Sequence, residues 1–213
     1  MAARPVLTMI AGPNGSGKST LTRELVARGV ELGRYINADE IDASLSGPAG
    51  EERSRRAQSL ADAARRECLE QGISFAFETV MSHRSKIEVL REARGRGYAI
   101  VIFFVALESP QLNIERVRQR VALGGHPVPE DRIVARYERA MTLLPEAMSL
   151  CDRSVLFDNS YRALEGGPVR LVPVCEVRPQ RETSAYVIVD RRQRPAWVQK
   201  VLERLEYHPP SDA

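Results

Sequence analysis

Apolar positions up to about residue 160 alternate between short continuous runs and longer segments with helical spacing. Val6–Ala11 is a short apolar run that ends in a glycine cluster, which is typical of a buried strand leading into a turn. Leu21, Leu25 and Val26 then recur at helical spacing, and Gly29 ends that segment. Repeated along the chain, this alternation predicts an α/β fold with a parallel sheet and helices on both of its faces.

The same pattern places the remaining elements of the sheet. The run 99–107 is so uniformly apolar that both faces of this strand should be covered, which puts it at the centre of the sheet. Pro145 either kinks the helix in which it lies or starts a new one. The predicted strands are 6–11, 35–37, 73–77, 99–107 and 154–157, and the predicted helices are 19–27, 51–71, 87–95, 110–123 and about 133–144.

The pattern changes after Gly166 and Gly167. Segments 169–177 and 185–189 predict a β-hairpin, and 196–205, around Trp197, predicts a last helix. We therefore expect a five-stranded core at 1–162, with a helical lid at about 110–140, followed by a hairpin and helix appendage at 163–213.

A phosphate-binding motif follows the first predicted strand directly. The chain reads Gly-Pro-Asn-Gly-Ser-Gly-Lys-Ser at 12–19, which is the P-loop pattern. Backbone N–H groups of such a loop face the phosphates, the lysine reaches the β and γ oxygens, and the serine hydroxyl binds Mg²⁺. The residues assigned to the nucleotide are Gly12, Pro13, Asn14, Gly15, Ser16, Gly17, Lys18, Ser19 and Thr20, with Ser19 as the metal ligand.

The nucleotide is expected to be ATP, because no Asn-Lys-x-Asp guanine signature is present. Since the P-loop lies between a strand and a helix, the fold class sharpens to a P-loop NTPase with a nucleotide-kinase-like sheet. Asn159 ends the fifth predicted strand and is expected on the base side of the nucleotide.

Polar residues end the second and third predicted strands. In doubly wound sheets ligands bind at the carboxyl ends of the strands, so these residues should face the γ-phosphate and its acceptor. They are Asn37, Asp39, Glu40, Glu78 and Thr79. An aspartate there can accept the proton of an attacking hydroxyl, which makes Asp39 the candidate base.

Each of the two leading carboxylates has a second reading. Asp39 could instead cap the helix suggested by residues 40–42. Glu78 follows a predicted core strand, where an unpartnered carboxylate is costly. It therefore binds substrate or metal-bound water, or it pairs with an arginine as part of the structure.

Arginines on both sides of a glycine and proline turn indicate a lid. Arg116 and Arg120 lie four residues apart and share a helix face, as do Arg132, Arg136 and Arg139 beyond the turn at 124–129. Two such faces can close over a triphosphate and neutralise the transferring group. Interleaved acidic residues also fit a solvated surface for any single one of these arginines.

Composition and charge restrict the class further. Among 213 residues the 31 basic side chains include only three lysines, and the net charge of +3 argues against a protein held to nucleic acid by its overall charge. Three widely spaced cysteines without a zinc pattern are typical of buried thiols in a reducing cytoplasm. No apolar run is long enough to span a membrane, and the N-terminal run is too short for a signal peptide.

Five motifs in this order resemble the zeta toxin family of P-loop proteins, in a branch often described as ABC-type ATPases although the chain has no ABC signature. The resemblance covers roughly residues 5 to 162. It rests on the P-loop, Asn-Ala-Asp-Glu at 37–40, Phe-Glu-Thr at 77–79, the arginine segment at 115–120 with the turn at 124–129, and Phe-Asp-Asn-Ser at 157–160.

The resemblance implies a nucleotide-kinase-like fold and an ATP-dependent kinase that phosphorylates the 3′-hydroxyl of the sugar in UDP-N-acetylglucosamine. It implies the nucleotide and Mg²⁺ roles for Lys18 and Ser19, the catalytic base for Asp39, and a phosphate-contacting lid residue for Arg116. Glu78 and Thr79 match the substrate side, and Arg120, Arg132 and Arg136 are all candidates for the second lid arginine.

Two function hypotheses follow. The first is a small-molecule kinase in the cytoplasm with ATP and Mg²⁺ as cofactors, a nucleotide sugar as acceptor and, by family analogy, an antitoxin protein as partner. The resemblance predicts the identity of the acceptor less well than it predicts the ATP site, because residues 40–70 differ from the family pattern. The second is an ATP-dependent switch that acts on a protein or nucleic-acid partner.

Overall fold

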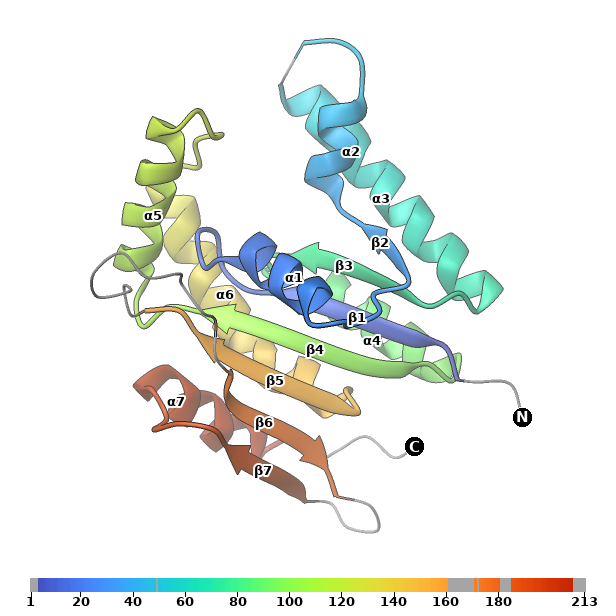
Figure 1. Ribbon diagram of the computed structural model, residues 1–213, viewed down its shortest axis with the longest axis vertical. Helices are drawn as coiled ribbons and strands as arrows, with labels where there is room; N and C mark the ends of the chain where they lie inside the picture. The colour runs from blue at the N-terminus through green and yellow to red at the C-terminus, as the bar shows by residue number, and fades with distance from the viewer. Residues whose placement is uncertain (1–3, 49, 161–170, 172, 181–184, 209–213) are drawn as a thin grey trace.

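A mostly parallel β-sheet forms the centre of the protein (Figure 1). The computed structural model describes residues 4–48, 50–160, 171, 173–180 and 185–208. Its strands are β1 (Val6–Ala11), β2 (Arg34–Ile36), β3 (Phe75–Thr79), β4 (Ala99–Ala106), β5 (Arg153–Asp158), β6 (Pro173–Pro179) and β7 (Tyr186–Asp190). In the described residues they form one seven-stranded sheet in the order β2-β3-β1-β4-β5-β6-β7.

Helices cover both faces of this sheet, as the apolar β1 and β4 require. Leu21 and Leu25 pack on one face, and the long helices of the core pack on the other. The helices are α1 (Lys18–Ala27), α2 (Ala38–Ser44), α3 (Glu51–Gln71), α4 (Ser85–Gly95), α5 (Pro110–Ala122), α6 (Glu130–Ser149) and α7 (Ala196–Leu205). Residues of α3, α4, α6 and α7 belong to the larger core cluster, and α1 belongs to the smaller one.

The α/β class is confirmed, but the prediction of five strands was wrong. β6 pairs antiparallel with β5, with Leu156 opposite Cys175, and β7 pairs antiparallel with β6. β5 carries the buried residues Val155, Leu156 and Phe157, so its outer edge needs hydrogen-bond partners away from water. The hairpin meets this need and extends the sheet.

Other predicted boundaries shift by a few residues. The third strand begins at Phe75 rather than 73 and includes Glu78 and Thr79 at its end. Residues 38–44, which the sequence suggested only in part as a helix, form α2. Pro145 lies inside α6 without ending it, so Arg132 and Arg136 belong to the same continuous helix as the core residues Leu144 and Met148.

The central strands end together at one edge of the sheet. Parallel pairing sets Ile10 opposite Glu78 and Ala11 opposite Thr79, so the chain leaves β1 for the P-loop where β3 presents its polar end. In Figure 1, α2 and α3 project on one side of this edge, and α5 with the start of α6 projects on the other. Among the helices described, none combines the length and apolarity that a membrane span needs.

Candidate active site

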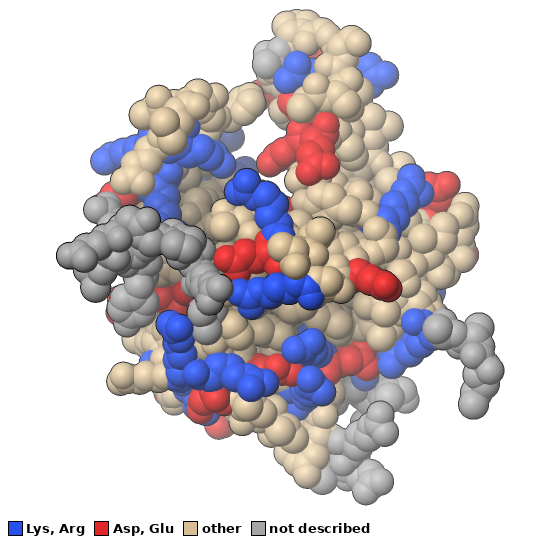
Figure 2. Space-filling view, viewed as in Figure 1, with Lys and Arg blue, Asp and Glu red and all other residues tan. Residues whose placement is uncertain are grey.

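A cleft of about 880 Å³ opens at this edge of the sheet, in the size range of sites for small ligands. Figure 2 shows the face hollowed between α5 and the α2–α3 arm, with basic side chains on the α5 side. The sequence-predicted residues that line it are Asn14, Gly15, Gly17, Lys18, Ser19, Thr20, Asn37, Asp39, Glu78, Thr79, Arg116, Arg120, Arg132 and Arg136. Gly12, Pro13, Ser16, Glu40 and Asn159 lie outside this lining.

The P-loop requires glycine where it passes over the neighbouring strands. Gly12 has φ 152°, and a Cβ there would lie 2.0 Å from the backbone oxygen of Val105 in β4. Gly17 has φ 102°, and its Cβ would lie 2.6 Å from the side-chain nitrogen of Asn159. Neither position admits a side chain, so the loop stays close to the sheet and its N–H groups remain open to a phosphate.

Two asparagines and an arginine hold the loop from outside. Asn159 donates to the Ser16 backbone oxygen at 2.9 Å, and Asn113 donates to the Asn14 backbone oxygen at 2.5 Å. Arg116 in turn donates to the backbone oxygen of Asn159 at 2.5 Å. Asn159, expected on the base side of the nucleotide, thus contacts the back of the P-loop. Sequence reasoning missed Asn113, whose signal is an amide at helical spacing from the buried Val117.

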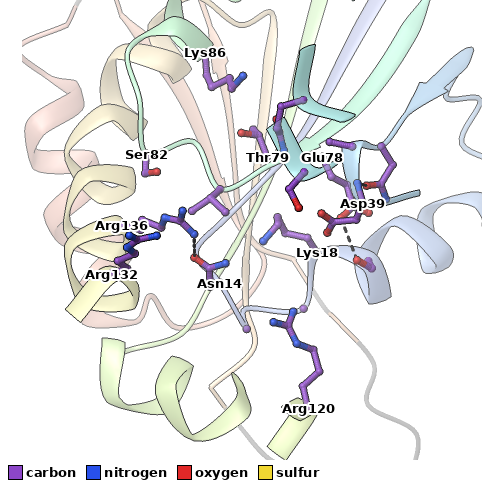
Figure 3. A pocket seen from close by; sticks show the side chains of 18 of the residues that line it. Asn14, Lys18, Asp39, Glu78, Thr79, Ser82, Lys86, Arg120, Arg132 and Arg136 are labelled. Atoms are coloured by element: carbon purple, nitrogen blue, oxygen red, sulfur yellow. Dashed lines mark hydrogen bonds between the residues drawn. The ribbon is translucent and has the colours of Figure 1, made fainter. Parts of the chain in front are cut away.

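Lys18 occupies the middle of the cleft (Figure 3). Its Nζ donates to the backbone oxygens of Gly12 and Pro13, both at 3.0 Å. Burial lowers the pKa of Lys18 to about 8, although Glu78 and Asp39 oppose this shift. A partly buried ammonium whose hydrogen bonds, among the described residues, go to neutral carbonyls is available to an incoming polyphosphate.

Glu78 accepts hydrogen bonds from three hydroxyl groups. Its Oε1 accepts from Thr22 at 2.6 Å and from Tyr35 at 2.7 Å, and its Oε2 accepts from Ser19 at 3.1 Å. No ion pair with an arginine is found for Glu78 among the described residues. Glu78 is therefore fixed beside the P-loop with one oxygen directed at Ser19.

These two oxygens suit Mg²⁺. The Ser19 hydroxyl and the Glu78 carboxylate are hard oxygen donors 3.1 Å apart, next to the loop that would hold the phosphates. No cluster of three acidic, His or Cys side chains able to hold a metal occurs in the described part of the chain. That is the arrangement that Mg²⁺ accepts, since it uses one or two protein ligands together with substrate phosphates and water.

Asp39 lies in the first turn of α2 on the opposite wall from the arginines (Figure 3). The helix is capped by Asn37, whose Oδ1 accepts from the backbone N–H of Asp39 at 3.0 Å. Asn37 also donates to Tyr35 at 3.1 Å and to Glu40 at 3.4 Å. The carboxylate of Asp39 is therefore not used as the cap and lines the cleft.

Four arginines line the α5–α6 wall, and they are Arg116, Arg120, Arg132 and Arg136. Arg136 approaches the P-loop directly, with Nη1 3.4 Å from Oδ1 of Asn14, and Arg120 donates to the His126 backbone oxygen at 2.9 Å. Arg139, expected on the same face, donates instead to the Ser82 backbone oxygen at 3.2 Å. The four arginines thus line one wall of the cleft, and Arg136 reaches the phosphate loop.

The rest of the lining includes residues that the sequence did not single out. They come from α3, from the segment after β3 and from α4, and they are Glu51, Ser54, Arg55, Gln58, Arg65, Val80, Ser82 and Lys86. Arg65 could have been identified from the sequence as a charged residue on the apolar face of α3, since it lies four residues after Ala61 and three before Cys68.

Comparisons with known proteins agree with this geometry. Residues 1–161 match the family model described as Zeta toxin. An uncharacterized protein of Haemophilus influenzae is 30% identical over 130 residues, which is 59% of this chain and 88% of that protein. The PezAT toxin-antitoxin system of Streptococcus pneumoniae contains a chain with a TM-score of 0.56 and 13% identity, covering 97% of this chain and 86% of that one.

A second solved structure has the same fold. AvrRxo1-ORF1 with ORF2 and ATP gives a TM-score of 0.59 at 14% identity, covering all of this chain and 66% of that one. At these identities the two structures establish the architecture alone, and the family model establishes the membership. With a P-loop, a lysine and an arginine wall around one cleft, the chain belongs to the zeta toxin family and is an ATP-dependent phosphotransferase.

Proposed function

We propose that the protein transfers the γ-phosphate of ATP to a hydroxyl group of a small molecule, and that this acceptor is a nucleotide sugar such as UDP-N-acetylglucosamine. The observation that carries the proposal is the division of the cleft. Lys18 and the arginines line the donor side, and Asp39 with α3 lines the other. A cleft of about 880 Å³ has room for the phosphates of ATP and an acceptor together.

On the donor side the chain supplies positive charge. The P-loop N–H groups and Lys18 hold the β- and γ-phosphates, and Arg116, Arg120 and Arg136 neutralise charge that develops during transfer. Ser19 and Glu78 would hold Mg²⁺, which when bound neutralises the phosphoryl oxygens. Lid closure by the arginine wall excludes water, which would otherwise compete with the acceptor hydroxyl.

On the acceptor side Asp39 serves as the general base. A carboxylate that lines the cleft and is not engaged in capping can accept the proton of the acceptor hydroxyl as it attacks. Asn37 fixes the start of α2 and so fixes the position of Asp39.

The test is transfer from ATP to UDP-N-acetylglucosamine with Mg²⁺, with product identified by mass spectrometry. Asp39→Asn should lower kcat by about 10²- to 10⁴-fold while leaving the Kd for ATP unchanged within about twofold. Glu40→Gln is the matched control, since Glu40 lies beside Asp39 and outside the cleft lining. Transfer by Asp39→Asn at the wild-type rate would refute the base assignment, and wild-type protein that transfers phosphate only to other acceptors would refute the nucleotide sugar.

A protein partner that blocks the cleft is proposed from the family alone. The PezAT and AvrRxo1 structures are described as complexes or systems of two components. We expect an inhibitory partner of this chain to weaken ATP binding, which a titration with a fluorescent ATP analogue in the presence of a candidate partner protein would measure.

A further inference from the structure

Two cationic side chains line the cleft away from the P-loop. Arg65 of α3 and Lys86 of α4 both contribute to the lining. Figure 3 shows Lys86 at the end of the cleft opposite Arg120, with Lys18 between them. These two residues are therefore separate from the arginine wall that serves the donor phosphates.

Arg65 is buried with an incomplete set of partners. Only 4% of the residue is exposed, and its guanidinium lies 5.0 Å from the centre of the Phe77 ring. Its Nη2 pairs with Asp62, but its Nε has no hydrogen-bond partner within the described residues. Burying a guanidinium is costly unless its donors are satisfied, so Arg65 makes this part of the cleft wall favourable for an anion.

Lys86 depends on the same carboxylate. Its Nζ lies 3.7 Å from Oδ1 of Asp62, and its side chain is 18% exposed while that of Asp62 is 56% exposed. Burial lowers the pKa of Lys86, and the neighbouring charge of Arg65 lowers it further. Two cations thus share one half-exposed carboxylate, which leaves a net positive charge in this wall.

We propose that Arg65 and Lys86 form a second anion site, which binds a phosphate or diphosphate group of the acceptor. This inference rests on the proposed function, because it assumes that the acceptor occupies the cleft with its hydroxyl at Asp39. An arginine fork and a lysine point charge on two different helices can share the several oxygens of one phosphate. Acceptors without such a group should then bind more weakly, since binding them would leave the charges of the two cations uncompensated.

Binding of inorganic pyrophosphate to the full chain tests the site directly. The P-loop is first saturated with AMP-PNP and Mg²⁺, and pyrophosphate is then titrated by calorimetry. Lys86→Gln should weaken pyrophosphate binding by tenfold or more, and Arg65→Lys should weaken it too, because a lysine keeps the charge but loses the planar fork. Lys200→Gln is the matched control, since Lys200 is exposed on α7 outside the cleft. Equal affinity in wild type and Lys86→Gln would overturn the proposal.

A purely structural role of the pair predicts a different result. If Arg65 and Lys86 only join α3 to α4 through Asp62, Lys86→Gln would lower the melting temperature and leave pyrophosphate affinity unchanged. Transfer kinetics separate this inference from the proposed function. With UDP-N-acetylglucosamine, Lys86→Gln should raise KM by tenfold or more with kcat within about twofold.

These assays distinguish failure of the proposed anion site from failure of the proposed kinase function. Transfer with an unchanged KM in Lys86→Gln would refute the anion site and leave the kinase standing. Loss of pyrophosphate binding in Lys86→Gln, in a protein that transfers phosphate to no hydroxyl acceptor, would support the site and refute the proposed function.

Discussion

The lowered pKa of Lys18 makes ATP affinity depend on pH in a calculable way. In the free protein burial brings this pKa to about 8, well below the ordinary value of 10.5. The phosphates of ATP favour the charged ammonium, so binding raises the pKa and ATP binds preferentially to the protonated form. Affinity is therefore highest below pH 8 and falls as the pH rises through the pKa of the free protein.

The size of the effect follows from the titration of one group. Between pH 7 and pH 9 the protonated fraction of Lys18 falls from about nine tenths to about one tenth, so the Kd should rise about tenfold, or ~1.4 kcal/mol. The terminal phosphate of ATP titrates near pH 6 and contributes little in this window.

Calorimetry measures both the affinity for ATP and the proton uptake that accompanies binding. The Kd for ATP is determined at pH 7, 8 and 9, and at pH 9 two buffers of different ionisation enthalpy give the proton uptake, which should approach one per ATP bound. Lys18→Gln is the control, since it removes the titrating group and should give a Kd that is weak and independent of pH. A wild-type Kd that is constant from pH 7 to 9, or an equal slope in Lys18→Gln, would refute the reasoning.

Three further predictions concern the P-loop, the carboxylate of Glu78 and the carboxylate of Glu176 in β6. Gly12→Ala should abolish ATP binding because its Cβ meets a β4 carbonyl at 2.0 Å, whereas Gly95→Ala, with open space around it, should bind normally in the same titration. Tyr35→Phe removes the 2.7 Å hydrogen bond to a carboxylate oxygen of Glu78 and should cost about 1.5–3 kcal/mol of unfolding free energy, measured in urea. Burial raises the pKa of Glu176, but Arg153 and Arg178 outweigh burial and bring it to about 2. At pH values above its ordinary pKa of 4.5, this carboxylate therefore stabilises the fold by about 3 kcal/mol. The difference in unfolding free energy between wild type and Glu176→Gln should disappear as the pH falls toward 2.

Local patterns were sufficient for much of the fold. The helix at 51–71 begins and ends as predicted, because an apolar stripe is followed by Gly72, and the last helix at 196–205 follows the apolar pattern around Trp197. Pairing between distant segments is different. Nothing local distinguishes a separate hairpin from one that extends the sheet, so the partner of β5 could not be read from the sequence.

The residues of the candidate site also fall into those with a local sequence signal and those whose roles depend on distant contacts. Lys18, Asp39 and Glu78 carry their signal in a motif or near a strand end, and all three line one cleft. Arg65 and Asn113 act through contacts with segments far away in the chain, so their roles emerge only once the helices are packed. Each was nevertheless a polar residue on an apolar helix face, which is a pattern worth following in other sequences.

The continuity of α6 has a mechanical consequence. Its first half carries Arg132 and Arg136 at the cleft, and its second half is clamped in the core around Leu144. A helix of 20 residues is about 30 Å long, so a tilt of about 5° at the clamped end moves the free end by about 2–3 Å. The helix works as a lever, and substitutions that loosen its seat near Leu144 should change the turnover rate far from the nucleotide, before they measurably change ATP affinity.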